Sequence, residues 1–318
     1  MGLRRLKLFS TYDLKAFSKR LKEIRKSLKF TQENVVAGTG LSAETLRKLE
    51  NGLVIPRYDT IEILSLFYKT DLQSVLNNYK SSKELIKFYD MVDYLVTHSN
   101  FESLLDTIQS FEIFSKNFDS NLIEKKELEQ LGLFFKGLHL SITKQNNQEM
   151  QQNAIDIYID SLKATNPKYN FDKWQEFKYS HVELRILFAI ASLYGYLRSC
   201  ELSNEILNFV LESLDYTSYS KHYDKLLITK VLSTISYNYH RIDRFEESLA
   251  FAQKGIDYCN EHSIMSYLPL FLFRKGVSEY YLKIDGYETN LDYAITLLKI
   301  QNQQDEANHY QLLSTKYR

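Results

Sequence analysis

Histidine and cysteine are the side chains best suited to metal binding and nucleophilic catalysis, and this 318-residue sequence has seven histidines and two cysteines. The histidines are His98, His139, His181, His222, His240, His262 and His309. They form no HExxH motif and no pair with cysteine at metal-ligand spacing. Cys200 and Cys259 have no CxxC partner, so we expect two buried, reduced thiols. The spacing predicts no metal site.

Other catalytic signatures are also missing from the sequence. Gly132 and Gly137 give G-x-x-x-x-G, but Leu138 stands where a phosphate-binding loop carries lysine. No G-x-S-x-G motif occurs, and many carboxylates lie beside Lys or Arg at helical spacing, as on a solvated surface. We therefore expect no enzyme, no catalytic residues and no cofactor.

A short predicted helix over residues 43–50 carries the most informative polar side chains. Leu46 and Leu49 are spaced to face a core, which directs a polar set outward. That set is Ser42, Ala43, Glu44, Thr45, Arg47 and Lys48. A helix fits the major groove of B-DNA, where Ala contacts a thymine methyl, Glu accepts from cytosine N4 and Lys donates to guanine. The alternative is that Glu44 and Arg47 only belong to a solvated surface.

Four more short helices are predicted around this one within the first 78 residues. Apolar spacing predicts a first helix over residues 14–28, and Thr31 is a plausible N-cap for a second over 32–38. Gly40 suits a left-handed turn, and Ser42 caps the helix that ends at Asn51-Gly52. Asp59 with Glu62 resembles a capping box for a fourth helix, and Asp71 starts a fifth. These elements form a compact all-helical domain.

The charge distribution separates the same segment from the rest of the chain. Residues 1–78 carry 14 Lys+Arg and 8 Asp+Glu, a net charge of +6, whereas the other 240 residues carry 26 and 32, a net charge of −6. The zero net charge of the whole chain hides this difference. A basic segment joined to an acidic one indicates a small polyanion-binding module on a larger domain.

The run from residue 21 to residue 76 resembles the helix-turn-helix domain of the lambda- and 434-repressor (Xre) type. The matching segments are LKEIRKSL (21–28), TQENVV (31–36), GLS (40–42), LRKLENG (46–52) and Pro56. The resemblance implies that Ala43, Glu44 and Lys48 read bases and that Gln32 clamps a phosphate and supports the recognition helix. Candidate phosphate contacts are Lys19, Lys22, Lys26 and Arg57. The sequence departs from the family at Val36 and Thr39, which indicates local repacking.

The rest of the chain, residues 79–318, is predicted to be a stack of helix pairs. Ten Gly and 3 Pro make about 4% of the chain, against roughly 12% on average, which disfavours sheet folds rich in tight turns. Residues 241–252 (RIDRFEESLAFA) repeat as residues 283–294 (KIDGYETNLDYA) at an offset of 42. The pattern resembles a degenerate tetratricopeptide repeat, which implies a right-handed α-solenoid. The expected pairs are 83–117, 122–164, 176–216, 220–260 and 264–300, with a closing helix at 303–316.

The first helices of such pairs line a concave face that suits an extended peptide. Aligning the repeats places Ile190 and Leu197 inward together with a larger set of groove residues. That set is Tyr194, Arg198, Ser233, Tyr237, Asn238, His240, Arg274, Lys275 and Glu279. Tyr and Asn are suited to holding a peptide, by aromatic area and by amide hydrogen bonds to its backbone. The alternative is that tyrosines at helical spacing belong to the core.

Both halves together resemble the peptide-pheromone-sensing regulators of the Rgg, PlcR and PrgX grouping. The resemblance implies a homodimer on a two-fold double-stranded DNA site and a short signalling peptide that controls it. The alternatives are a helical-repeat interaction protein and a mobile-element repressor without a peptide ligand. No apolar run of about 18 residues occurs and the basic start, Met1 to Leu8, lacks a cleavage site, so we expect a cytoplasmic protein without a membrane span.

Overall fold

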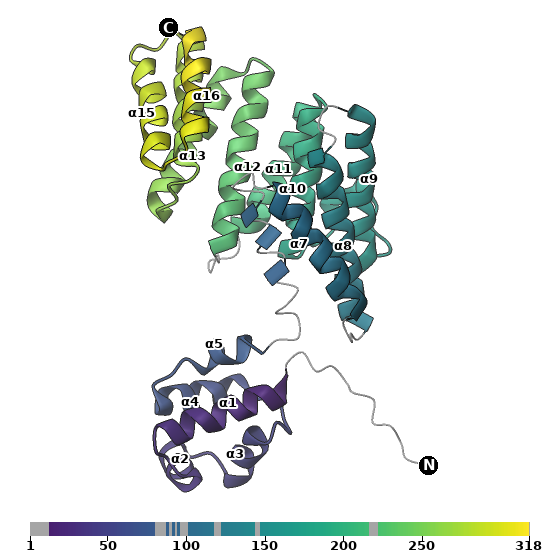
Figure 1. The fold of residues 1–318 in the computed structure, drawn as a ribbon, viewed down its shortest axis with the longest axis vertical. Helices are drawn as coiled ribbons and strands as arrows, with labels where there is room; N and C mark the ends of the chain where they lie inside the picture. Colours follow the sequence, from purple (N-terminus) through teal and green to yellow (C-terminus); the bar gives the residue numbers. More distant parts are fainter. Residues whose placement is uncertain are drawn as a thin grey trace. The chain divides into compact units, whose positions relative to one another are not determined.

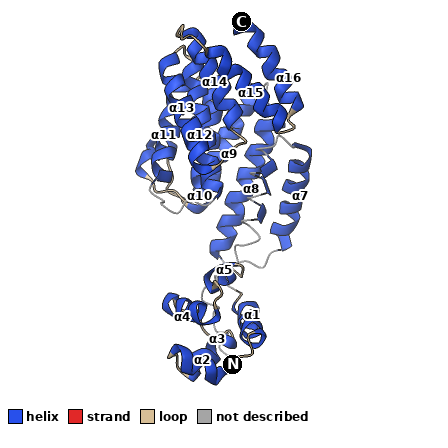
Figure 2. Cartoon of the chain, turned by 90° about the vertical axis from the view of Figure 1, so that its left-hand side faces the viewer, coloured by secondary structure: helices blue, strands red, loops and turns tan. Residues whose placement is uncertain are grey.

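The computed structural model describes residues 13–79, 87–88, 91–92, 94–95, 101–117, 122–143, 147–215 and 222–317. Every regular element in these ranges is a helix, as Figures 1 and 2 show. The chain divides into two compact units, residues 1–125 and 126–318. The domain boundary expected after residue 78 lies within the first unit and remains a prediction.

Five short helices in the first unit enclose one hydrophobic core. They are α1 (Leu14–Ser27), α2 (Gln32–Thr39), α3 (Ala43–Glu50), α4 (Tyr58–Tyr68) and α5 (Leu72–Asn77). The core residues recur at helical spacing, as the sequence predicted. They are Phe17, Leu21, Ile24, Val35, Leu46, Leu49, Ile61, Leu64, Tyr68, Leu72 and Leu76. The same unit also contains α7 (Phe101–Asn117).

Side-chain caps fix the starts of three of these helices where the sequence placed them. The side chains of Thr31, Ser42 and Asp71 accept hydrogen bonds from the backbone N–H groups of the first turns of α2, α3 and α5. Gly40 ends α2 in the left-handed conformation, with φ of 71°. These caps satisfy backbone donors that the helices themselves leave unpaired.

The predicted capping box of the fourth helix is wrong. α4 begins at Tyr58, one residue before Asp59, and its N-cap residue Arg57 makes no side-chain capping bond. The extended backbone of Arg57, which follows Pro56, starts the helix early. Asp59 therefore lies in the first turn, where its carboxylate accepts from the N–H of Thr60 at 2.7 Å and is favoured by the helix dipole.

Paired helices make up the second unit. They are most of α8 (Leu122–Thr143), then α9 (Gln148–Thr165), α10 (His181–Tyr196), α11 (Cys200–Asp215), α12 (His222–Arg241), α13 (Phe245–His262), α14 (Leu268–Tyr281), α15 (Tyr287–Ile300) and α16 (Gln304–Ser314). Two 3₁₀ turns, η1 (Phe171–Glu176) and η2 (Thr315–Tyr317), complete it. From α9 to α16 each helix packs against the next, and α12 also contacts α10 and α14, the first helices of the neighbouring pairs. The first helix of the expected pair 83–117 falls largely outside the described residues.

The sequence repeat at an offset of 42 matches the helices at one end only. α13 and α15 begin 42 residues apart, at Phe245 and Tyr287, whereas α12 and α14 end only 40 residues apart. The connection between α14 and α15 is two residues longer than the one between α12 and α13. It includes Gly286 in the left-handed conformation, with φ of 84°. None of the helices in the described ranges is long and apolar enough to cross a membrane.

Candidate functional site

The α2–turn–α3 unit presents the start of α3 to solvent. Leu46 and Leu49 anchor the inner side of α3 in the core, and Ala43, Glu44 and Arg47 lie exposed on the outer side. Gly52, two residues after the end of α3, has φ of 64°, and a Cβ there would lie 2.8 Å from the backbone oxygen of Leu14. Only glycine fits this close approach in this conformation. The chain after α3 thus passes close to the start of α1.

The charged side chains on the outer face of α3 are paired with one another. The Glu44 carboxylate accepts from Arg47 Nε at 2.8 Å and Nη2 at 2.9 Å, and lies 3.4 Å from Lys48 Nζ. The hydrogen bonds from Arg47, supported by the charges of Arg47 and Lys48, lower the pKa of Glu44 to about 2. All three side chains are roughly half exposed, so they can exchange partners at little cost. At the start of the helix, the hydroxyl oxygens of Ser42, the N-cap residue, and Thr45 lie 2.8 Å apart.

A buried ion pair behind α3 was missed by the sequence reasoning. Glu50, whose side chain is fully buried, accepts from Arg25 Nε at 2.6 Å and from Arg25 Nη2 at 3.0 Å. Arg25 also donates to the backbone oxygen of Phe30 at 2.8 Å, and its hydrogen bonds to Glu50 raise its pKa. Gln32 completes the network by donating from Nε2 to Glu50 at 2.8 Å. The pair therefore ties α3 to α1 and to the start of α2.

A positional signal for this pair does exist in the sequence. Residues 46, 49 and 50 share one helical face, so Glu50 had to lie beside two buried leucines and required a cationic partner. Gln32 was expected to support the recognition helix, and its bond to Glu50 at the end of α3 is such a support. Its expected contact with a phosphate remains a prediction.

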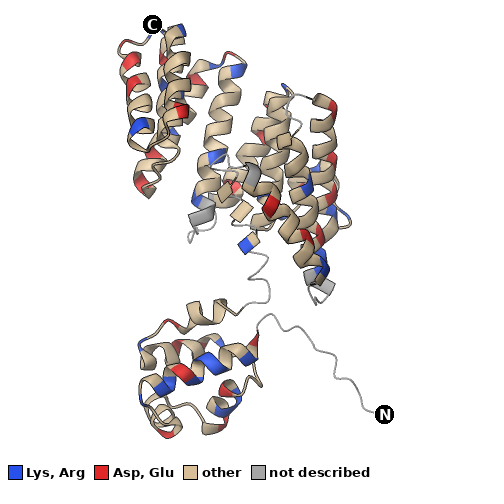
Figure 3. Ribbon diagram, in the orientation of Figure 1, with Lys and Arg blue, Asp and Glu red and all other residues tan. Residues whose placement is uncertain are grey.

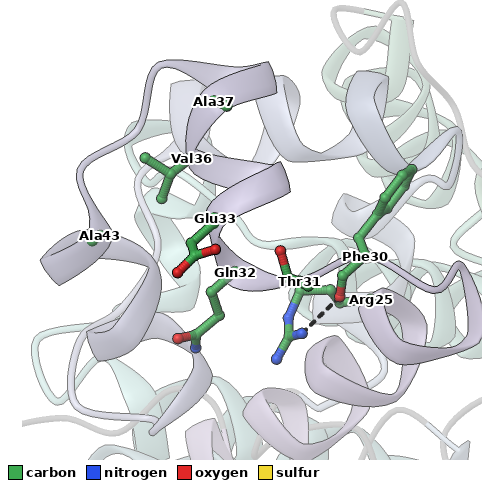
Figure 4. A pocket seen from close by; sticks show the side chains of 8 residues that line it. All are labelled: Arg25, Phe30, Thr31, Gln32, Glu33, Val36, Ala37 and Ala43. Carbon is green, nitrogen blue, oxygen red and sulfur yellow. Dashed lines mark hydrogen bonds between the residues drawn. The ribbon is translucent and has the colours of Figure 1, made fainter.

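An open hollow of about 780 Å³ lies between the start of α2 and the start of α3. Figure 4 shows Ala43 on one side, Arg25 and Phe30 on the other, and Gln32 and Glu33 between them. The dashed line marks the bond from Arg25 to Phe30. The wall therefore combines polar groups of α2 with the first residue of α3.

The expected phosphate contacts are exposed or bound to other polar groups at the surface. Lys19 and Lys26 on α1 are exposed, as is Arg57 before α4. Lys22 donates to the side chain of Asn51, which follows α3, at 3.0 Å. Figure 3 shows Lys and Arg on α1 and α3 with acidic residues among them.

Some of the expected groove residues lie on a partly open face of the first helices. Tyr237 is 44% exposed, and its ring packs 4.6 Å from Arg274 Cζ. Tyr194 stacks on Phe171 of η1, and Ser233 and His240 are half-buried. A further residue, Arg198, lies in the turn after α10, with φ of 70°.

Other expected groove residues make hydrogen bonds inside the stack instead. Asn238 is only 1% exposed and donates to Ser203 Oγ and to Asn204 Oδ1, both at 2.8 Å. Its predicted position on an open groove face is therefore corrected. Of the two inward apolar residues, Ile190 is fully buried in the core, whereas Leu197 is half-buried.

Lys275 and Glu279 also point to neighbouring helices. Lys275 donates to Gln253 on α13 at 2.9 Å, and Glu279, which is buried, accepts from Asn290 on α15 at 2.6 Å. The nine expected residues thus do not form one continuous wall. In the part of the chain that the structure describes, no three His, Cys, Asp or Glu side chains gather to hold a metal ion.

Comparisons with known proteins show which family and which solved structures this chain is similar to. The family HTH_3, described as helix-turn-helix, matches residues 21–75. No curated protein sequence matches the chain. The Bacillus thuringiensis PlcR structure in complex with the peptide PapR7 and DNA matches 93% of this chain and 99% of its own, with a TM-score of 0.74 and 16% identity.

Two further structures have the same fold. ComR from S. thermophilus, in complex with DNA and its signalling peptide ComS, matches 95% of this chain and 99% of its own, with a TM-score of 0.59 and 14% identity. A variant of the Streptococcus dysgalactiae SHP pheromone receptor Rgg2 matches 94% and 98%, with a TM-score of 0.60 and 13% identity. The resemblance to the Rgg, PlcR and PrgX grouping and the all-helical fold class are confirmed. The one matched family is a helix-turn-helix family and not an enzyme family, in line with the expectation. Residues 21–75 are therefore a helix-turn-helix domain, and the chain has the fold of the peptide-sensing regulators PlcR, ComR and Rgg2.

Proposed function

We propose that this chain is a cytoplasmic transcription regulator that binds a two-fold DNA site as a homodimer through α3. A short linear peptide, bound along the first helices of the repeat pairs, controls its affinity for DNA. The observation that carries the proposal is the open face of α3, anchored by a buried ion pair, on a chain with the fold of two proteins crystallised with DNA and a peptide.

The open face of α3 has the chemistry that base reading requires. Its first turn is exposed at Ala43 and Glu44, and residues at the start of a recognition helix are those that reach base edges. Arg47 and Lys48 can exchange Glu44 for guanine or phosphate, because the pairs are exposed and confined to one helix. Gln32, Ser42, Thr45 and Arg57 surround this face and are the proposed phosphate and positioning contacts.

Fluorescence anisotropy tests the DNA-binding half of the proposal. The full-length protein is titrated into a labelled duplex from upstream of its own gene, and in parallel into a shuffled duplex of equal composition. We expect affinity for the upstream duplex at least about 10³-fold greater than for the shuffled one. Binding that depends on salt but is the same for both duplexes contradicts the proposal.

A second candidate is a repressor of the same architecture that has no peptide ligand. It is favoured by the hydrogen bonds of Asn238, Lys275 and Glu279 within the stack, which remove three expected contacts from the groove. The two candidates differ in one measurement. Secreted peptides encoded beside the gene change the DNA affinity of a peptide-controlled regulator and leave that of the second candidate unchanged.

A further inference from the structure

Arg274 on α14 is a half-buried cation without an anionic partner among the described residues. Its side chain makes no hydrogen bond or ion pair with any of them, and its Cζ lies 4.6 Å from the centre of the Tyr237 ring. The neighbouring cations on α12 and α14 differ in this respect. Arg241 donates to the backbone oxygen of Gly195, and Lys275 donates to Gln253.

The surroundings of Arg274 are aromatic. Tyr310 of α16 and Tyr317 of η2 lie close enough to interact with its charge, as does Tyr237 of α12. Burial in this cluster lowers the pKa of Arg274, although a guanidinium remains charged at neutral pH. Carboxylates occur near the cluster, Asp243 beside His240 and Glu306 beside Tyr310, but neither forms an ion pair with Arg274.

His240 on α12 adds a second unpaired polar group. Its ring packs against Phe245 and Tyr281, and its Nδ1 is buried without a hydrogen-bond partner among the described residues. Burial, followed by the charge of Arg274, lowers the pKa of His240 to about 4. At neutral pH the imidazole is therefore uncharged, and Arg274 provides the positive charge of this cluster.

A partly desolvated guanidinium is unfavourable unless an anion pairs with it. The planar guanidinium of Arg274 can donate two parallel hydrogen bonds to a carboxylate. The Tyr237 ring packs against the guanidinium. We infer that Arg274 binds a carboxylate of the peptide, from either its C-terminus or an acidic side chain. The inference rests on the proposed function and names the chemical group that the groove selects.

The first experiment uses a T7 phage library of random heptapeptides with free carboxyl termini, selected on the full-length protein. An enriched peptide is then synthesised as the free acid, as the C-terminal amide, and with each Asp or Glu changed to Asn or Gln. We expect one of these changes to weaken binding to the wild-type protein by about tenfold or more. The form that loses affinity identifies which carboxylate Arg274 holds.

Variants of Arg274 test whether this residue causes the loss of peptide affinity. Arg274→Gln is expected to bind the parent peptide about tenfold more weakly and to bind the parent and the carboxylate-free form equally. Arg274→Lys, which keeps the charge and loses the planar guanidinium, should give an intermediate affinity and guards against a folding defect in the glutamine variant. The matched control is Lys275→Gln, which should bind within about twofold of wild type. Unchanged binding to Arg274→Gln, or equal affinity for all peptide forms, overturns the inference while the proposed peptide control stands.

A second probe separates failure of the inference from failure of the proposed function. Acetate is titrated into the ¹⁵N-arginine-labelled protein, and the Nε–Hε resonance that Arg274→Gln lacks is followed by NMR. A shift with millimolar acetate supports the anion site. If acetate shifts the resonance but the library yields no peptide, the assignment to a peptide is overturned together with the proposed control. If neither probe binds, no anion site exists at Arg274.

Discussion

The outer face of α3 in the first unit and the surroundings of Arg274 in the second differ in how their charges are paired. On α3 the exposed Glu44, Arg47 and Lys48 are paired with one another, whereas on α14 the half-buried Arg274 has no anionic partner within the described residues. An exposed pair gains little from its partner and is easily exchanged for a phosphate or a base. A cation that is partly removed from water gains more from an anion that reaches it. An exposed pair therefore suits a helix face that samples many DNA sequences, whereas a half-buried single charge suits the proposed peptide site, which selects one ligand.

Breaking the buried pair behind α3 should give the largest effect. Glu50→Ala leaves Arg25, whose side chain is only 11% exposed, without its partner and removes the bond to Gln32. We expect the free energy of unfolding of the helix-turn-helix domain to fall by about 3–5 kcal/mol, since an uncompensated charge remains inside. Chemical denaturation followed by circular dichroism measures it. The matched control is Glu33→Ala, an exposed carboxylate in the first turn of α2, which should cost at most about 1 kcal/mol.

Asn238→Ala tests whether this side chain belongs to the groove or to the stack. The substitution leaves Asn204 and Ser203 without their buried donor, so we expect a loss of about 1–3 kcal/mol in the free energy of unfolding. Thermal and urea unfolding report it, with Ser233→Ala, half-buried on the same helix, as the control. If Asn238→Ala instead weakened peptide binding without loss of stability, Asn238 would be a peptide contact and not a structural residue.

His240, which lies near Arg274, makes the stability of the second unit depend on pH. Its pKa is about 4 in the folded chain and near 6.5 when unfolded, so between these values the unfolded state binds more protons. Stability contributed by the neutral ring is present above pH 6.5 and is lost as the pH falls towards 4. We expect about 1–2 kcal/mol, less than the full shift implies because the ring is only partly enclosed.

Urea titrations of wild type and His240→Gln between about pH 4 and 7 isolate this contribution. The difference between the two curves should grow as the pH rises, because carboxylates titrate in both proteins and cancel. Arg274 supports the shift and Asp243 opposes it, so Arg274→Gln should raise the pKa of His240. Parallel curves for the two proteins would show that the ring is solvated.

The sequence predicted elements better than side-chain directions. Apolar spacing located the core of the first domain, and Thr31, Ser42 and Asp71 marked helix starts because a cap depends on neighbours within one turn. The prediction that Asp59 caps the fourth helix was wrong because α4 begins one residue earlier, at Tyr58. The local pattern at that position fits two helix starts, and only the packed domain selects one.

Contacts between helices distant in the sequence could not be predicted in the same way. Asn238 and Lys275 were placed in the groove, yet each finds its partner on a different helix, 34 and 22 residues away in the sequence. The connection after α14 is two residues longer than the one after α12, so an offset of 42 does not hold along the whole pair. Glu50 illustrates the converse, since its place on a leucine-lined face required a partner without saying that it was Arg25.

The smallest effect on stability should come from Glu44→Ala, which opens the pairs on α3. Because these groups are exposed, the unfolding midpoint should move only slightly. The released Arg47 and Lys48 become free to contact phosphates, so affinity for shuffled duplex should rise and the salt dependence should steepen by about one charge. Preference among operator variants should change by about tenfold at the base pair that Glu44 contacts. Anisotropy at several salt concentrations, with Gln32→Ala as the variant that weakens all duplexes alike, measures both quantities. An unchanged salt slope together with an unchanged base preference would mean that Glu44 is only a surface charge, and the contrast between the two units would then lie in Arg274 alone.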